Sequence, residues 1–327
     1  METTSVRDNH SFGPSKIAIV GGGIIGVCTS LALQDQYPHS TITLYSDRWT
    51  PQTTGNVSAG LIFPYSIGPK TDPNLLDRLL GDTMLFFQKL ISDPLSGEIG
   101  VSLLTTYELN ESTHTTIPSF PNVLDIRQLT ENELTRIRGN NERLRSGLKC
   151  TTYIAEPTLL LPYLMERFKC KGGIMVTQKI SALNQLTVIN DLVVNCTGIG
   201  SRYLHDVQDQ RIHSLRGQVA RIRAPWIRHA ILAGLNYIIP NRDCVIIGGT
   251  KQAHDYCMEA RDSDMKDIID GCALLNPSIR KAEIIDRSAD LRPFRDSIRL
   301  ERDPNYDRII HNYGHGGSGV TLCWGSA

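Results

Sequence analysis

The chain has 327 residues, and its 34 Lys and Arg balance its 34 Asp and Glu, so the formal net charge at pH 7 is zero. A chain of this length predicts about two domains. The charge balance argues against a nucleic-acid partner or an anionic membrane surface, since both select proteins with a basic excess or patch. Hydrophobic residues make up 40% of the chain and charged residues 21%, which is typical of a globular protein and excludes disorder.

The cysteine and histidine residues lack the spacing of metal ligands. The eight cysteines contain no C-x-x-C, and the nine histidines contain no H-E-x-x-H. We therefore expect no metal site. The absence of closely spaced cysteine pairs favours a reducing compartment.

Residues 1–14 are polar and are predicted to form a flexible tail. The uncharged run 17–33 follows Lys16, but it is shorter than a membrane span and contains three consecutive glycines. Residues 16–20 are rich in β-branched side chains, which predicts a buried strand. An apolar helix over 27–34 and a second strand over 41–45 complete a βαβ unit.

The first turn of this unit carries a nucleotide-binding pattern. Gly21, Gly23 and Gly26 fit G-x-G-x-x-G, in which the glycines make a tight turn, admit the pyrophosphate and let helix and strand touch. The phosphates would lie at the helix N-terminus, where free N–H groups favour negative charge. Asp47, just after the second strand, is the candidate acidic ribose ligand. The pattern alone leaves NAD and FAD open.

The rest of the chain predicts a mixed architecture. Residues 108–147 are polar and charge-rich, without the pattern of a buried sheet. Three apolar or alternating runs favour an antiparallel sheet, namely 218–222, 237–239 and 245–247. Helices are expected around 86–91, 162–168 and 265–275, a buried strand over 191–195, and a glycine-rich return over 309–321.

Segments along nearly the whole chain resemble the D-amino-acid oxidase family in the same order. They are Ile19–Gly26, Tyr45–Pro51, Ala59–Tyr65, Asn195–Gly198, Leu215–Gln218, Ala224–Trp226, Tyr237–Pro240, Leu291–Pro293 and His311–Gly319. The resemblance implies an α/β fold in which a Rossmann-like FAD-binding domain is joined to a mixed-sheet substrate domain. It assigns residues 15–75, 150–212 and 300–327 to the FAD-binding domain, and 76–149 with 213–299 to the substrate domain.

The resemblance also implies FAD as the cofactor and a set of residues that contact it. This set comprises Gly21, Gly23, Ile24, Ile25, Asp47, Arg48, Thr53, Thr54, Gly60, Leu61, Ile180, Thr197, Gly316, Gly317, Ser318, Gly319, Val320 and Thr321. Backbone N–H groups of the second glycine-rich loop could hold the electron-rich end of the isoalloxazine.

Three further residues would bind the substrate. By resemblance, Arg292 grips the α-carboxylate, which suits a guanidinium fork, and the Tyr237 hydroxyl assists it. Lys251 matches a cationic position of family members that act on acidic D-amino acids. It is either a buried ammonium that faces the pocket or an exposed lysine at a strand end. A second arginine of such members has no clear match, and Leu232 aligns with it.

The expected reaction is the oxidation of a D-amino acid by O2, with a 2-oxo acid, ammonia and hydrogen peroxide as products. Acidic substrates, D-aspartate and D-glutamate, are the first expectation. An oxidase of neutral D-amino acids, a catalytically impaired FAD-binding relative and a nicotinamide-dependent dehydrogenase are the alternatives.

The resemblance implies a peroxisomal protein with a further C-terminal helix and a tripeptide such as S-K-L. The sequence stops at Trp324–Ala327 without either. We therefore expect weaker flavin retention, and a location that is either peroxisomal, as the resemblance implies, or cytoplasmic for want of the tripeptide.

Overall fold

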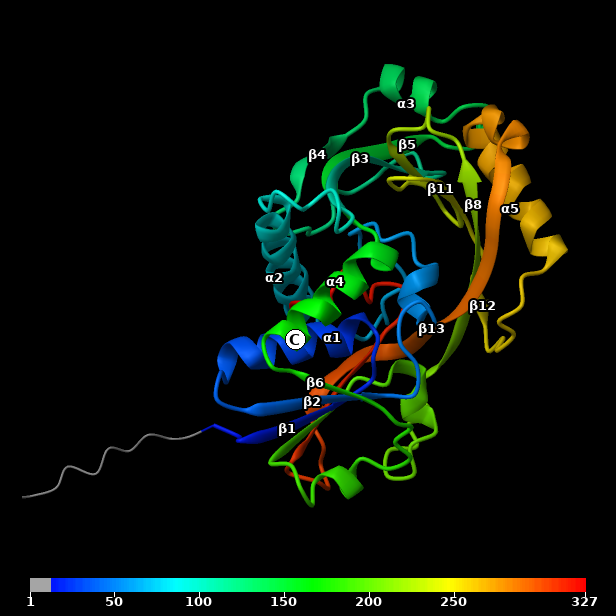
Figure 1. Ribbon diagram of the computed structural model, residues 1–327. Coiled ribbons are helices and arrows are strands. Elements are labelled where there is room, and N and C mark those ends of the chain that lie inside the picture. Colours follow the sequence, from blue (N-terminus) through cyan, green and yellow to red (C-terminus); the bar gives the residue numbers. More distant parts are fainter. Residues whose placement is uncertain (1–12) are drawn as a thin grey trace, which may run out of the picture.

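The structure is a computed structural model that describes residues 13–327. Most of the predicted flexible tail, residues 1–12, lies outside the described residues. The described strands form one continuous mixed sheet in the order β4-β5-β3-β9-β10-β11-β8-β13-β14-β7-β1-β2-β6, with the short β12 also paired to β8 (Figure 1). The fold is thus α/β with a mixed sheet, as the sequence predicts.

One end of the sheet is parallel. It contains β1 (Lys16–Val20), β2 (Thr41–Ser46), β6 (Ile174–Thr177), β7 (Leu192–Asn195) and β14 (Ile309–His315). The helices α1 (Ile24–Gln36), α2 (Pro73–Ile91) and α4 (Pro157–Cys170) contribute buried side chains to the same core as β1 and β2. The predicted strand–glycine turn–helix–strand unit is confirmed.

The other end of the sheet is mainly antiparallel. Its strands are β3 (Val101–Asn110), β4 (Leu124–Gln128), β5 (Ser146–Ala155), β8 (His213–Arg223), β9 (Ala230–Ala233), β10 (Asn236–Pro240), β11 (Val245–Gly248) and β12 (Gln252–Ala253). Helix α5 (Asp262–Leu275) buries Met265, Ile268 and Cys272 in a core with Ile238 and Ile247. A short helix, α3 (Glu131–Ile137), begins with a capping box between Thr130 and Glu133. Short 3-10 helices occupy Thr54–Val57, Asn184–Leu186, Gly198–Arg202 and Pro277–Lys281.

One long strand, β13 (Glu283–Arg302), joins the two ends of the sheet. Residues 283–294 pair with β8, and residues 294–302 pair with β14 after a shift of register. The boundary expected between residues 299 and 300 therefore falls inside β13. The boundaries at 75/76 and 149/150 fall inside α2 and β5, and the division into two domains remains a prediction.

The segment 108–147 contains more regular structure than its sequence predicts. It holds the end of β3, all of β4 and α3, and the start of β5. The pattern was hidden because only Leu109 is buried in the end of β3, and because β4, at the sheet edge, has no buried side chain. Among residues 13–327, no helix is long and apolar enough to cross a membrane.

Candidate active site

A cavity of about 850 Å³ lies where the parallel and antiparallel parts of the sheet meet, and it is lined from both. Nearly all the predicted site residues line it. They are Gly21, Gly23, Ile24, Ile25, Asp47, Arg48, Thr53, Thr54, Gly60, Leu61, Ile180, Thr197, Gly316, Gly317, Gly319, Val320, Tyr237 and Arg292. Ser318, Thr321 and Lys251 do not line it.

The glycine turn after β1 leaves room for a ligand at one glycine only. Gly21 has φ +124°, and a Cβ there would collide with the Cys196 carbonyl oxygen. A Cβ on Gly26 would collide with the Gly21 carbonyl oxygen, so helix and strand touch at this point. A Cβ on Gly23 would meet no atom within 4 Å. The backbone at Gly23 therefore borders open space, as a bound pyrophosphate requires.

Helix α1 presents an uncapped N-terminus to this space. Its N-cap residue, Gly23, offers no side chain, and its first turn contains no acidic residue. The neighbouring N–H of Gly22 donates to Ser46 Oγ at 3.1 Å, which fixes the turn against the end of β2. The unpaired N–H groups and the helix dipole thus favour a phosphate group.

Side chains around the rest of this half are mostly held by their neighbours. Thr54 Oγ1 donates to Asp290 Oδ1 at 3.1 Å, and Thr197 Oγ1 donates to Asn195 Oδ1 at 2.8 Å. Asp47 is half-exposed, and its carboxylate lies 3.9 Å from the Arg48 guanidinium. Asp47 therefore remains accessible to a ligand at the end of β2.

The glycine-rich loop after β14 is anchored by its hydroxyl side chains. Ser318 Oγ accepts the Tyr65 N–H at 2.8 Å and donates to the Tyr65 carbonyl oxygen at 2.8 Å. Thr321 Oγ1 donates to the Phe63 carbonyl oxygen at 3.1 Å. These side chains are buried and hold the loop in place, so any ligand contact at these two positions would involve their backbone.

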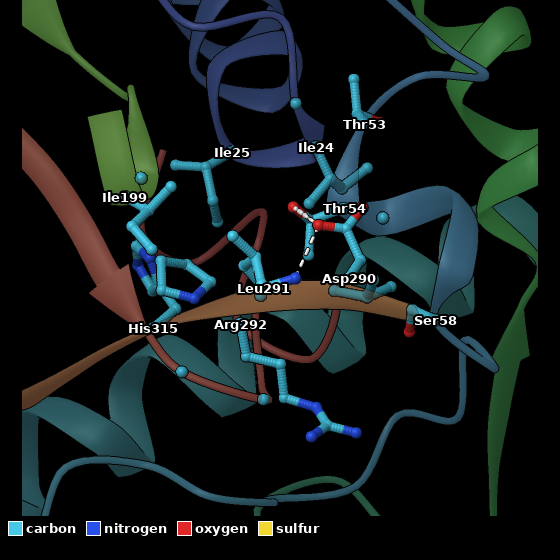
Figure 2. Close-up of a pocket in the computed structure, with 18 of the residues that line it drawn as sticks. Ile24, Ile25, Thr53, Thr54, Ser58, Ile199, Asp290, Leu291, Arg292 and His315 are labelled. Atoms are coloured by element: carbon cyan, nitrogen blue, oxygen red, sulfur yellow. Dashed lines mark hydrogen bonds between the residues drawn. The ribbon is translucent and has the colours of Figure 1, made fainter. Parts of the chain in front are cut away.

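Arg292 extends from β13 into the half of the cavity that the antiparallel strands line (Figure 2). Its Nη1 donates to the Thr250 carbonyl oxygen at 2.9 Å, and its Cζ lies 5.7 Å from the centre of the Tyr65 ring. A Cβ on Gly217 would collide with the guanidinium. The arginine is thus positioned by a carbonyl, an aromatic ring and a glycine, and the rest of its donors can bind a ligand.

Tyr237 lies beside Arg292, packed on the backbone of Gly248 and Gly249. Burial raises the pKa of its hydroxyl to about 12, although the nearby Arg292 acts in the opposite direction. Tyr237 is therefore a neutral hydrogen-bond donor at ordinary pH.

Lys251 is exposed rather than buried. Its Nζ lies 5.9 Å from the centre of the Tyr65 ring, on which Arg292 also packs. Of the two alternatives that the sequence left open, the structure has the exposed lysine, although its ammonium lies near Tyr65, which lines the cavity.

Several residues that line the cavity were not predicted from the sequence as site residues. Tyr65 and His315 lie within segments that resemble the family, and that resemblance could have identified them. Nothing in the sequence singled out Glu108 or Asp290, which also line the cavity. His315 is buried, and its Nε2 has no hydrogen-bond partner among the described residues. Burial lowers the pKa of its imidazole to about 4, so His315 is neutral at neutral pH.

Comparison with known proteins agrees with this site. The family described as FAD dependent oxidoreductase matches residues 16–327. D-aspartate oxidase from Homo sapiens is 34% identical over 322 residues, which cover 96% of this chain and 92% of the relative. D-amino acid oxidase from Dugesia ryukyuensis is 34% identical over 324 residues, which cover 95% of each chain. The structure of glycine oxidase from Geobacillus kaustophilus, 16% identical, superposes with a TM-score of 0.78 over 96% of this chain and 92% of that one.

The residues present fit FAD. The open space at Gly23, the uncapped helix α1 and the partnerless Nε2 of His315 are unmet binding features along one cavity. FAD is the cofactor, and α1 would hold its pyrophosphate while the loop from Gly316 to Val320 would hold its ring system. The chain therefore belongs to the D-amino-acid oxidase family of FAD-dependent oxidoreductases.

Proposed function

We propose that the protein oxidises free D-amino acids at Cα, with O2 as the electron acceptor. The observation that carries this proposal is the Arg292 guanidinium, which enters the same cavity as the nucleotide-binding turn, beside the Tyr237 hydroxyl. A guanidinium fork binds a carboxylate at two points, and a neutral phenol can donate a further hydrogen bond. An α-amino acid offers such a carboxylate next to the carbon that is oxidised.

When bound, FAD supplies the hydride acceptor, and O2 then takes up the electrons as hydrogen peroxide while water converts the imino acid to a 2-oxo acid and ammonia. The chain's own residues would orient the substrate. Arg292 and Tyr237 would fix the α-carboxylate, and the carbonyl of Thr250 would fix Arg292.

Acidic D-amino acids are the substrate class that Lys251 supports. An ammonium beside Tyr65, which lines the cavity, would attract a side-chain carboxylate, and one relative is named for D-aspartate. Neutral D-amino acids are the second candidate, because Lys251 is exposed and another relative of the same identity is named for D-amino acids in general. Lys251→Met separates the two classes: it should lower kcat/KM for D-aspartate and not for D-alanine if the acidic class is correct.

The decisive experiment is an anaerobic titration of the FAD-loaded protein with D- and L-isomers of aspartate, alanine and arginine, followed by flavin absorbance. Bleaching by D-isomers alone supports the proposal. A yellow protein that no D-isomer bleaches would instead be a catalytically impaired FAD-binding relative, and the proposal would be wrong. The peroxisomal location that the resemblance implies would confine the hydrogen peroxide, and microscopy of the N-terminally tagged protein tests it.

A further inference from the structure

Glu108 lies on the same row of the sheet as Tyr237. In β3, Glu108 is the register partner of Leu232 in β9, and Leu232 is the register partner of Tyr237 in β10. All three residues line the large cavity. Since neighbouring strands lie about 4.8 Å apart, Glu108 and Tyr237 are separated by about 10 Å across the sheet. A substrate whose carboxylate lies at Tyr237 and Arg292 could therefore reach Glu108 with a long side chain.

The Glu108 carboxylate is not used by the fold. Among residues 13–327 no hydrogen bond or ion pair is found to it. By contrast, the Asp290 carboxylate, which also lines the cavity, accepts from Thr54 Oγ1 and from the Leu291 N–H. Burial raises the pKa of Glu108 from its ordinary value, because the surrounding protein leaves its carboxylate poorly solvated. A partly buried carboxylate without a partner is costly, and a cationic ligand would remove that cost.

Glu108 also lines a second, neighbouring cavity, of about 550 Å³. The two cavities share Phe63, Pro64, Glu108 and Asn110. The second cavity is otherwise lined by Glu111, His114 and several hydroxyl and apolar side chains, with no lysine or arginine. The space beyond Glu108 therefore has room for the end of a side chain, and its formal charges are negative.

We propose that Glu108 determines side-chain specificity, and that it selects D-amino acids with a long side chain ending in a cation, such as D-arginine or D-lysine. This inference rests on the proposed function. The Glu108 carboxylate would bind the cationic end and would repel a side-chain carboxylate, so attraction and repulsion act in the same direction. Glu108 and Lys251 thus make opposite predictions for D-aspartate, and Glu108 is the one of the two that lines the cavity.

The test compares kcat/KM for D-arginine, D-aspartate and D-alanine in the FAD-loaded wild type, Glu108→Gln and Glu142→Gln. Glu142 is exposed and lines neither cavity, so its variant is the matched control. The wild type and Glu142→Gln should prefer D-arginine to D-aspartate. Relative to D-alanine, Glu108→Gln should lose about tenfold or more in kcat/KM on D-arginine and gain on D-aspartate. A wild type that prefers D-aspartate, or an unchanged substrate ratio in Glu108→Gln, would overturn the inference.

A second variant covers the case in which Glu108→Gln folds poorly. Glu108→Asp keeps the charge but shortens the side chain, and it should retain the preference for D-arginine over D-aspartate at reduced kcat/KM. Loss of that preference in a variant that keeps its charge would contradict the proposed role. Oxidation of D-alanine distinguishes a failure of the Glu108 proposal from a failure of the proposed function. If D-alanine is oxidised and D-arginine is not, only the role of Glu108 is wrong. If no D-amino acid reduces the flavin, the proposed function fails as well.

Discussion

The two halves of the cavity offer different chemical groups to a ligand. The half next to α1 offers mainly backbone, with open space at Gly23, free N–H groups at the helix N-terminus and the loop around Gly317. The half under the antiparallel strands offers side chains, chiefly Arg292, Tyr237 and Glu108. A cofactor common to many enzymes can be bound by backbone, which any sequence with the right glycines provides. A particular substrate has to be recognised by charge and shape, which only side chains provide.

Removal of Arg292 should give the largest effect and should be confined to the substrate half. Arg292→Ala is expected to lower kcat/KM by about 1,000-fold, because it removes a charged partner from a desolvated carboxylate. The flavin absorbance per protein should stay at the wild-type value. Steady-state oxygen consumption measures the first quantity and a visible spectrum the second. Near-wild-type turnover would refute the role of Arg292.

Gly217→Ala should disturb the same half of the cavity without removing a charged side chain. The new Cβ would occupy the position of the Arg292 guanidinium, so the arginine must move and kcat/KM should fall roughly 10- to 100-fold. Gly97→Ala is the matched control, because a Cβ at Gly97 would meet no atom within 4 Å. Equal kinetics in the two variants would mean that the arginine does not depend on Gly217.

Two glycines of the cofactor half separate FAD binding from folding. Gly23→Ala adds a methyl group into open space, so the melting temperature of the FAD-free protein should be unchanged while FAD affinity falls about tenfold. Gly26→Ala drives a methyl group into the Gly21 carbonyl oxygen, and it should lower that melting temperature as well. Melting curves with and without FAD measure both effects. A Gly23→Ala protein with wild-type FAD affinity would argue against the pyrophosphate position.

Tyr237→Phe should have the smallest effect, about fivefold and mainly in KM, because it removes one neutral hydrogen bond from the carboxylate. Burial raises the pKa of Tyr237 to about 12, so the wild-type hydroxyl stays protonated up to about pH 10. Wild type and variant should therefore show pH profiles of the same shape below that value. A limb that disappears in the variant would mean that Tyr237 ionises during the reaction.

The same contrast explains what the sequence could predict. The βαβ unit, the glycine turn and the strands β8, β10 and β11 followed from local pattern, because hydrophobic period and glycine position are local properties. The positions of Arg292 and Tyr237 in one cavity with the turn were predicted only through family resemblance, because they depend on pairing between distant strands. Glu108 was missed altogether. It lies in a segment whose polarity resembles that of a surface, and only the pairing of β3 with β9 brings it into the cavity.

The long strand β13 limits the design of chimeras in which a segment of this protein is replaced by that of a relative. It pairs with β8 over its first part and with β14 over its second, so a single stretch of backbone belongs to both halves of the cavity. Within it, Asp290 is tied to Thr54 on the cofactor side, and Arg292 enters the substrate side two residues later. A chimera joined at either end of β13 would inherit one partner strand from a foreign parent. Substrate specificity in this fold is therefore better altered by point substitution than by grafting a whole module.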